Sequence, residues 1–213
     1  LILDQGFYPD GIYTAPTDEA LKHDIEMSMA MGFNGARLHQ KVFEARFLYW
    51  ADRLGYLCWG EMASWGIDAS RPMTMGIMLR EWLESVERDF CAPSIIGWCP
   101  YNEVWGESNN GLRQLTLQMT YRATKAADPT RPVIDASGGF HCCETDIYDI
   151  HDYEQDVNVY KERYKAGAPL FEPCPGKQLY TGGPRFVSEY GGIYWSNDEK
   201  GWGYGVAPKS REE

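Results

Sequence analysis

The sequence is poor in basic residues, with 20 Lys and Arg against 31 Asp and Glu in 213 residues and a formal net charge of −11. A nucleic-acid partner requires clustered Lys and Arg to neutralise phosphates, and an anionic membrane surface attracts the same residues. The sequence also lacks an apolar run long enough to cross a bilayer and a charged-then-apolar leader at its N-terminus. We therefore expect a soluble chain with neither nucleic acid nor a membrane as its partner.

Cysteine is scattered and shows no CxxC pair. The six cysteines lie mostly within apolar segments, so we interpret them as buried, reduced thiols, which favours a cytoplasmic location with the periplasm as the alternative. The segment 141–144 (HCCE) contains possible metal ligands, but its adjacent cysteines and the lack of a second ligand pair argue against a metal site. We expect no metal and no other cofactor. The cysteines are Cys58, Cys91, Cys99, Cys142, Cys143 and Cys174.

Strand-like and helix-like segments alternate along the chain, and an apolar content of 44% suffices for one compact domain over residues 1–213. The clearest helix follows the capping residue Thr17, carries apolar Leu21, Ile25 and Met29 on one face, and ends at Gly32. Alternation of this kind implies parallel strands joined by helical crossovers. We expect strands at 1–3, 34–38, 56–59, 95–100, 132–135, 146–150 and 185–188, and further helices at about 47–54, 77–90, 112–127 and 156–166.

Two folds fit this alternation, a doubly wound sheet and a (β/α)8 barrel. The first would be supported by a phosphate-binding loop, but neither GxGxxG nor GxxxxGK[ST] is present. In a barrel, functional side chains lie at the carboxyl ends of several strands, and polar residues collect there in this sequence. We therefore predict an α/β fold, a (β/α)8 TIM barrel. The polar residues at the strand ends are Arg37, His39, Glu61, Asn102, Glu103, His151, Tyr153 and Glu189.

Glu103 and Glu189 are the strongest candidates for catalysis. Each follows a strongly apolar strand segment, IIGWCPYNE and RFVSEYGG, which places a charge at a strand mouth beside aromatic residues. Opposed carboxylates are the minimal apparatus for cleaving a glycosidic bond, and the fourth and seventh strands of a barrel face each other. A separation of about 5–5.5 Å would imply retention at the anomeric carbon, and about 6.5–9.5 Å would imply inversion.

The segments NGARLHQ, FLYWADRLGYLCWGEM, PSIIGWCPYNE, DPTRPVIDASG and FVSEYGG together resemble the catalytic barrel of glycoside hydrolase family 2, which includes β-galactosidases, β-glucuronidases and β-mannosidases. The resemblance extends over nearly the whole chain. It implies a retaining β-glycosidase that hydrolyses terminal β-linked sugars of the β-galactoside or β-glucuronide type, with a carbohydrate as its substrate. It assigns Glu103 as the general acid/base and Glu189 as the nucleophile.

The same resemblance implies roles for neighbouring residues. Asn102 would bond the substrate 2-hydroxyl, and Arg37 would keep the nucleophile ionised, although a structural ion pair is an alternative reading. Tyr153 would hydrogen-bond the nucleophile, with His151 in its place if the alignment shifts. His39 is a candidate substrate contact or a histidine of the barrel rim.

Tryptophans offer apolar platforms for sugar rings, and Trp105 and Trp195 are singled out because they follow the two glutamates. Trp59, Trp65 and Trp98 are further candidates, although most tryptophans in such a chain belong to the core. A Glu-x-His metal pair and an Asn-x-Lys pair, which some members of the family carry, are not evident in this sequence.

The chain resembles a fragment, since a helix and an eighth strand would be expected after the seventh. We thus expect a barrel truncated before the eighth strand, with an open edge through which the chain could contact a second copy. The alternative to an active glycosidase is an inactive fragment or carbohydrate-binding barrel that keeps the cleft without turnover. A serine hydrolase is disfavoured because GxSxG is absent.

Overall fold

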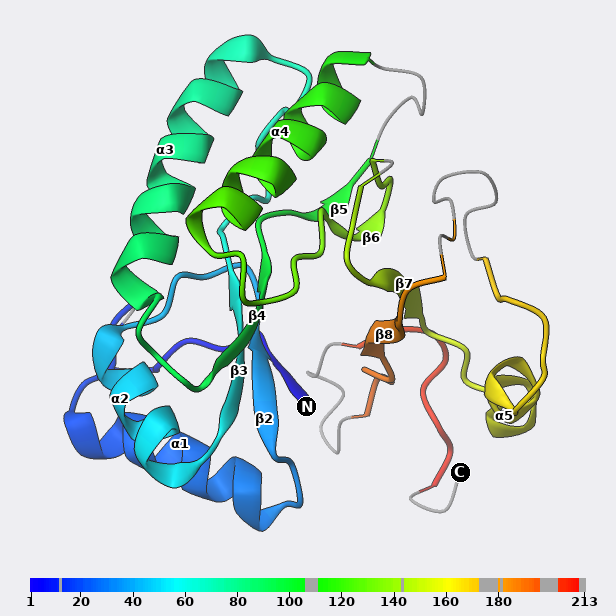
Figure 1. The fold of residues 1–213 in the computed structure, drawn as a ribbon. Coiled ribbons are helices and arrows are strands. Elements are labelled where there is room, and N and C mark those ends of the chain that lie inside the picture. Colours follow the sequence, from blue (N-terminus) through cyan, green and yellow to red (C-terminus); the bar gives the residue numbers. More distant parts are fainter. Residues whose placement is uncertain are drawn as a thin grey trace.

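The computed structural model describes residues 1–11, 13–105, 111–142, 144–172, 180, 182–195 and 203–210. Strands and helices alternate over most of this length (Figure 1), and every pair of neighbouring strands is parallel. The elements are β1 (Ile2–Asp4), α1 (Asp18–Ala30), β2 (Gly35–Leu38), α2 (Ala45–Leu54), β3 (Leu57–Glu61), α3 (Pro72–Asp89), β4 (Ile95–Cys99), β5 (Asn102–Val104), α4 (Gly111–Ala127), β6 (Ser137–Gly139), β7 (Tyr148–Asp152), α5 (Val157–Tyr164) and β8 (Arg185–Tyr190).

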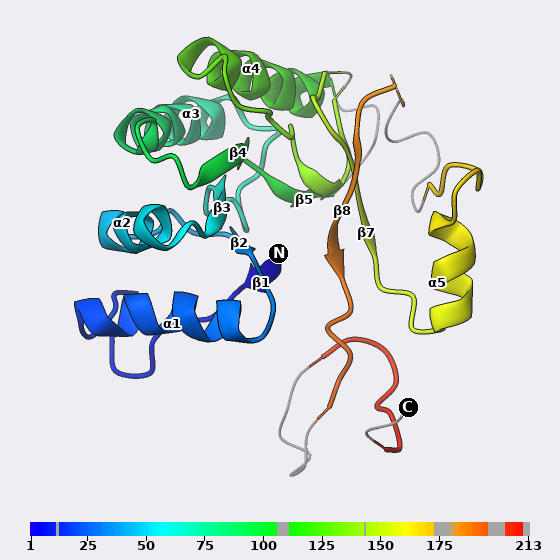
Figure 2. The ribbon, with the colours of Figure 1, turned by 60° about the horizontal axis from the view of Figure 1, so that its bottom comes forward.

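The strands form a four-stranded sheet in the order β1-β2-β3-β4 and two pairs, β5-β6 and β7-β8. In Figure 2 they follow an arc, with α1 to α4 on its outer side and α5 outside β7. The predicted α/β class with parallel strands is thus confirmed. The structure does not confirm a (β/α)8 barrel, because the strands are short and do not form one continuous sheet in the described part of the chain.

Local chemistry explains the helix ends. The Thr17 side chain accepts a hydrogen bond from the backbone N–H of Ala20, so it caps α1 as expected. Gly55 ends α2 in the left-handed conformation that glycine adopts most readily. Helix α3 begins at Pro72, five residues before the predicted start, because proline at the first turn sacrifices no helical hydrogen bond.

One predicted strand is wrong. Within 132–135 the structure has only an isolated parallel bridge between Val133 and Trp98. Asp146 supplies part of the bonding there, since its carboxylate accepts from the backbone N–H of Val133. Residues 132–134 therefore bond to Trp98 of β4 and to Asp146 without forming a strand, and the next paired strand is β6.

The main core lies between the four-stranded sheet and the helices that cover it. Trp82 of α3 and Trp98 of β4 meet edge to face at 5.8 Å, and the Trp82 indole donates to Thr124 of α4. None of the described helices combines the length and apolar character that crossing a membrane requires. Trp59 and Trp98 are buried, so these two tryptophans are core residues rather than platforms for a sugar.

Four cysteines fall within the described residues, and all four are free. Cys58, Cys99 and Cys142 are buried as predicted. Cys91 is exposed, which corrects the prediction for that residue, because it follows the end of α3 at the surface. Cys143 and Cys174 lie outside the described residues.

Candidate active site

Arg37, at the carboxyl end of β2, lies at the centre of a buried polar cluster. Its Nε and Nη2 donate to the two carboxylate oxygens of Glu61 at 2.6 and 3.0 Å. Nη2 also donates to Asn102 Oδ1 at 2.6 Å, and Nη1 donates to Glu189 Oε1 at 3.0 Å. Only 2% of Arg37 is exposed, and a charge this deep requires such partners. One guanidinium thus joins residues of β2, β3, β5 and β8.

The charges of this cluster stabilise one another. Burial alone would raise the pKa of Glu61, but the adjacent Arg37 charge lowers it below the usual value. Burial alone would lower the pKa of Arg37, and Glu61 raises it. Both residues are therefore ionised, and Arg37 presents a fixed positive charge to Glu189. Sequence analysis located Glu61 at a strand end but assigned it no role. A charged residue at the end of the apolar segment LCWGE was the signal that could have identified it as part of the site.

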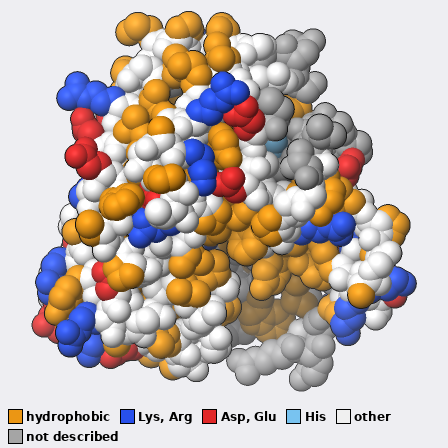
Figure 3. Space-filling view, in the orientation of Figure 1, with side chains coloured by type: hydrophobic (Ala, Val, Ile, Leu, Met, Phe, Trp, Pro, Cys, Tyr) orange, Lys and Arg blue, Asp and Glu red, His pale blue; other side chains and the backbone are white. Residues whose placement is uncertain are grey.

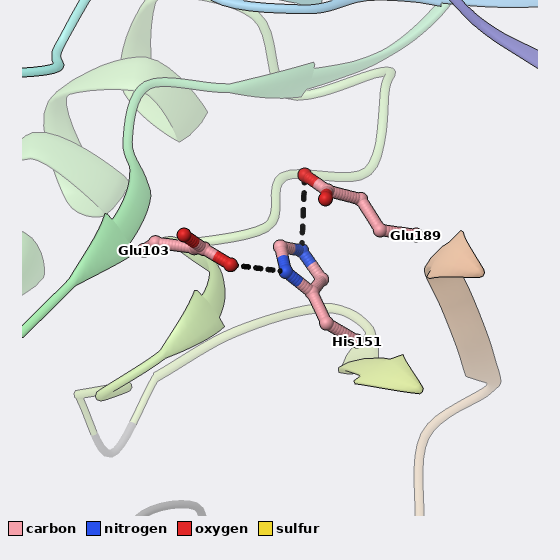
Figure 4. A group of neighbouring side chains, drawn as sticks. All are labelled: Glu103, His151 and Glu189. Carbon is pink, nitrogen blue, oxygen red and sulfur yellow. Dashed lines mark hydrogen bonds and ion pairs between the residues drawn. The ribbon is translucent and has the colours of Figure 1, made fainter. Parts of the chain in front are cut away.

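Glu103 and Glu189 lie on the two sides of His151 (Figure 4). His151 Nδ1 is 2.9 Å from Glu103 Oε1, and His151 Nε2 is 3.5 Å from Glu189 Oε1. A carboxylate oxygen of each glutamate and a ring nitrogen of His151 all lie within 4.8 Å of one another. The structure therefore brings the two predicted carboxylates together. Both lie within short strands, Glu103 in β5 and Glu189 in β8, rather than beyond strand ends.

Ser137 of β6 holds His151 from the other side, with 2.8 Å between its Oγ and His151 Nε2. Ser137 Oγ also lies 2.8 Å from Ser188 Oγ. The contacts Ser137, His151 and Glu103 follow the order of a serine-hydrolase triad. Ser137 has no exposed surface, so a substrate carbonyl cannot reach it, and we interpret the serine as a support for the imidazole. Sequence reasoning missed this support because it depends on how β6 lies against β7.

Glu103 has an unusual backbone, with φ of 45° in the left-handed region that non-glycine residues seldom occupy. Such conformations concentrate at functional sites, where the surrounding structure holds them. A hydrogen bond from His151 lowers the pKa of the Glu103 carboxyl, against the opposing effect of burial, and a bond from Trp105 adds to the lowering. Glu103 is thus a well-supported carboxylate in the free protein.

Tyr153 donates a hydrogen bond from its hydroxyl to Glu189 Oε2. The predicted contact between Tyr153 and the proposed nucleophile is therefore present, and His151 contacts both carboxylates rather than replacing Tyr153. Burial and the bond to Glu189 raise the pKa of Tyr153, so its proton stays in place as a donor. Tyr204 stacks on the Tyr153 ring at 4.3 Å and fixes its plane.

His39 lies at the edge of the cluster, with Nδ1 3.4 Å from Glu61 Oε1 and 3.7 Å from Glu189 Oε1. Trp105 lines a cavity together with Asn102 and Glu103. Trp195 is 43% exposed, and no hydrogen bond or ring contact joins it to another described residue. Of the two tryptophans singled out from sequence, the structure therefore places only Trp105 beside a carboxylate.

The spacing of Glu103, His151 and Glu189 would suit a metal ion, since each offers one ligand atom. Their oxygens and nitrogens already bond Arg37, Tyr153 and Ser137.

The HCCE segment, 141–144, contacts a carboxylate of the chain itself: Asp135 accepts from the Cys142 backbone N–H and lies 2.9 Å from His141 Nδ1. Asp135 thus holds this turn, and Cys143 lies outside the described residues.

Comparison with known proteins finds similar sequences among β-galactosidases. The chain is 32% identical over 138 residues to "Beta-galactosidase 2" of Enterobacter cloacae, an alignment that covers 61% of this chain and 13% of the relative. The chain thus spans about an eighth of the length of that protein. No protein-family model matches the chain.

Solved structures agree in fold. A family 2 (GH2) β-galacturonidase of Eisenbergiella tayi, bound to galacturonate, matches with a TM-score of 0.66 and 20% identity over 92% of this chain and 37% of its own. A β-glucuronidase of Bacteroides uniformis, covalently bound to cyclophellitol-6-carboxylate aziridine, matches with a TM-score of 0.55 and 25% identity over 64% of this chain and 17% of its own.

Proposed function

We propose, from the premise that this chain carries a glycosidase domain like those of glycoside hydrolase family 2, that it supplies both catalytic carboxylates of a retaining β-glycosidase. The observation that carries the proposal is the approach of Glu103 and Glu189 to either side of His151, in a site where the buried Arg37 also contacts Glu189. The substrate is a terminal β-linked sugar of the β-galactoside or β-glucuronide type.

In the first step, a Glu189 carboxylate oxygen attacks the anomeric carbon while the bond from that carbon to the leaving oxygen breaks. Glu103 acts here in its protonated form, which is the minor form in the free protein because His151 lowers the pKa of the carboxyl. It transfers this proton to the leaving oxygen, so that an alcohol departs and a glycosyl ester forms on Glu189. Arg37 and Tyr153 hold the attacking carboxylate from two directions and fix its orientation.

In the second step, Glu103, now a carboxylate, takes a proton from water as the water oxygen attacks the anomeric carbon. The ester bond to Glu189 breaks, the sugar leaves with its original configuration, and Glu103 is protonated again. The hydrogen bond from His151 stabilises the charged form of Glu103, which suits the base of this second step.

The separation of the carboxylates supports retention over inversion. One carboxylate oxygen of Glu103 and one of Glu189 lie no more than 4.8 Å apart, which is short of the about 6.5–9.5 Å that inversion needs for a water and favours the closer spacing of retaining enzymes. Asn102 Oδ1 accepts from Arg37, so the amide N–H groups of Asn102 are its candidate donors to a substrate 2-hydroxyl.

We also propose that β1 to β8 form most of the wall of a (β/α)8 barrel, in which β4 and β5, separated by only two residues, are one barrel strand. A cavity of about 510 Å³ lies between β1 and β8 and is lined by Leu3, Phe186 and Val187 among others. Figure 3 shows a hollow with hydrophobic side chains on this face. Within the described residues, β1 pairs only with β2 and β8 only with β7, so a further parallel strand would fit between them. The free thiols agree with a reducing compartment such as the cytoplasm.

The test is to replace Glu189 by Gln in the full-length polypeptide and to assay aryl β-galactosides and β-glucuronides. We expect kcat to fall by roughly 10⁴-fold or more, because the nucleophile is lost. A 2-deoxy-2-fluoro glycoside should trap the wild-type enzyme with the label on the peptide that contains Glu189, as mass spectrometry would show. Glu84→Gln, at an exposed pair with Arg80, is the matched control.

Hydrolysis that survives in the Glu189→Gln variant would remove Glu189 as nucleophile. A folded wild-type protein that neither turns over nor becomes labelled would favour the non-catalytic alternative, a carbohydrate-binding barrel.

A further inference from the structure

A second cavity, of about 330 Å³, adjoins the carboxylates on the side of Glu103. Its wall is formed by the segment 64–69 after β3, by β5 with Trp105, and by Arg113 of α4. Glu103 lines this cavity and Glu189 does not, whereas Glu189 lines the cavity of about 510 Å³ beside β1. Glu103 therefore borders this cavity from the side of the catalytic cluster.

The position of Glu103 at this cavity has a consequence for the leaving group under the proposed function. In a retaining displacement the leaving group departs away from the nucleophile and toward the acid that protonates it. The space bordered by Glu103 is therefore where the leaving group must lie, and the residues that line it are placed to select that group.

Two large apolar side chains are exposed at this cavity. Trp65 is 65% exposed and Trp105 is 49% exposed, although indole rings usually bury most of their surface. Flat aromatic faces of this kind pack well against the apolar face of another ring. The two tryptophans come from separate places, Trp65 from the segment 64–69 and Trp105 from directly after β5, and both border the space next to Glu103.

The segment that carries Trp65 is anchored to the catalytic cluster. Gln40 Oε1 accepts from the backbone N–H groups of Ser64 at 2.7 Å and of Trp65 at 3.0 Å. The backbone N–H of Gln40 donates to Glu61 Oε1 at 3.1 Å, and Gln40 has a φ of 56°. A residue in the left-handed region thus links the Trp65 loop to the buried Arg37–Glu61 pair, so the cavity wall is ordered before any ligand binds.

We propose that this cavity is a leaving-group subsite that binds a ring with an apolar face, a pyranose or an aromatic ring, through Trp65 and Trp105. The proposal rests on the proposed function and extends it from the sugar that is transferred to the group that is released. Substrates with ring-shaped leaving groups should therefore be preferred over those with small ones.

The test compares substrates that share one sugar and differ in the leaving group: a glycosyl fluoride, an aryl glycoside and a disaccharide. Trp65→Ala should lower kcat/KM for the ring-bearing substrates about fivefold to tenfold relative to the fluoride, since stacking of one ring contributes about this much. Tyr13→Ala, an exposed aromatic outside both cavities, should leave this ratio unchanged. An equal loss on all substrates would overturn the subsite, and the aryl and disaccharide arms show which ring it favours.

Trp105 needs a milder change, because its hydrogen bond contributes to the low pKa of Glu103. Trp105→Phe keeps an aromatic face and removes the N–H. The subsite predicts that the ratio between ring-bearing and fluoride substrates survives in this variant, while the pH profile shifts. If this ratio is lost in Trp105→Phe, Trp105 acts only through its hydrogen bond to Glu103, and its part in the subsite is overturned.

Direct binding separates this proposal from the proposed function. An aryl thioglycoside should bind the wild-type protein more tightly than the methyl thioglycoside, and Trp65→Ala should remove the difference in calorimetric titration. If the wild type fails to hydrolyse even the glycosyl fluoride, the proposed function fails while this measurement still decides the subsite. Equal affinity for both thioglycosides in the wild type would overturn it.

Discussion

Arg37 is the residue on which the charges of the site depend. Its guanidinium contacts Glu61 and Glu189, each of which has almost no exposed surface. Removing one member of a buried ion pair leaves the other charge without compensation, which is far more harmful than losing an exposed pair.

We therefore expect Arg37→Gln to lower the free energy of unfolding by about 3–5 kcal/mol near neutral pH. Because the folded pKa of Glu61 lies below its unfolded value, the stability that its charge contributes is present above the unfolded pKa and is lost as pH falls through the folded pKa. The difference between wild type and variant should accordingly shrink in acid. Urea denaturation at neutral and acid pH measures this, with Arg80→Gln at an exposed pair as the control. A difference that does not vary with pH would refute the electrostatic explanation.

Tyr153→Phe removes one hydrogen bond to Glu189 and keeps the ring that Tyr204 stacks on. A hydrogen bond to a charged group contributes about 1.5–3 kcal/mol, so kcat should fall roughly 10- to 100-fold with little change in stability. Steady-state kinetics and thermal unfolding would measure both. Tyr164→Phe, which removes a tyrosine bond to Asp152, is the matched control. An unchanged kcat would mean that Tyr153 fills space beside Glu189 without contributing to catalysis.

At the scale of elements, the pairing of β5 with β6 and the packing of β6 on β7 create the catalytic geometry. Gly138 of β6 has a φ of 63°, and a Cβ built on it would lie 2.6 Å from the His151 ring. Position 138 therefore requires glycine for two reasons: its positive φ, and the space that the His151 imidazole occupies beside it.

Gly138→Ala should therefore displace His151 and reduce kcat at least about tenfold, because supporting groups must hold catalytic geometry closely. We expect a moderate loss of stability as well, since alanine is strained at this φ. Gly32→Ala, at a φ of 93° with open space around it just beyond α1, is the control for backbone strain alone. Equal activity loss in both variants would show that contact with His151 does not matter.

The sequence predicts the elements better than the contacts between them. Caps such as Thr17 and apolar periodicity are local, so the helices were found with shifts at their ends, and polar residues after apolar runs located Arg37, Glu103 and Glu189. The isolated bridge at Val133 and the support of His151 by Ser137 depend on neighbouring strands. No local pattern encodes the left-handed backbone of Glu103, because tertiary contacts impose it.

At the scale of the whole molecule, the cavity between β1 and β8 is the most consequential feature for solution behaviour. Among the described strands, β1 and β8 each leave one edge unpaired beside this partly apolar space, and unpaired edges favour association with other chains. Pairing through these edges is the geometric basis for the expected contact with a second copy.

We expect the 213-residue chain to sediment with a concentration-dependent increase in average mass. Leu1→Lys introduces a charge at the lining of this cavity and should weaken the association several-fold. Met73→Lys adds the same charge at an exposed position of α3 and serves as control. Equal behaviour of the two variants in sedimentation velocity would place the association elsewhere.

The Arg37 guanidinium also constrains which substitutions the site can accept during evolution. Because three of its neighbours, Glu61, Asn102 and Glu189, share one fork of donors, the harm from altering any of them depends on which others are intact. A library of paired variants would therefore record strong epistasis among these positions and near-additive behaviour at the cavity tryptophans. Specificity for the sugar that is transferred would therefore evolve more slowly than specificity for the leaving group.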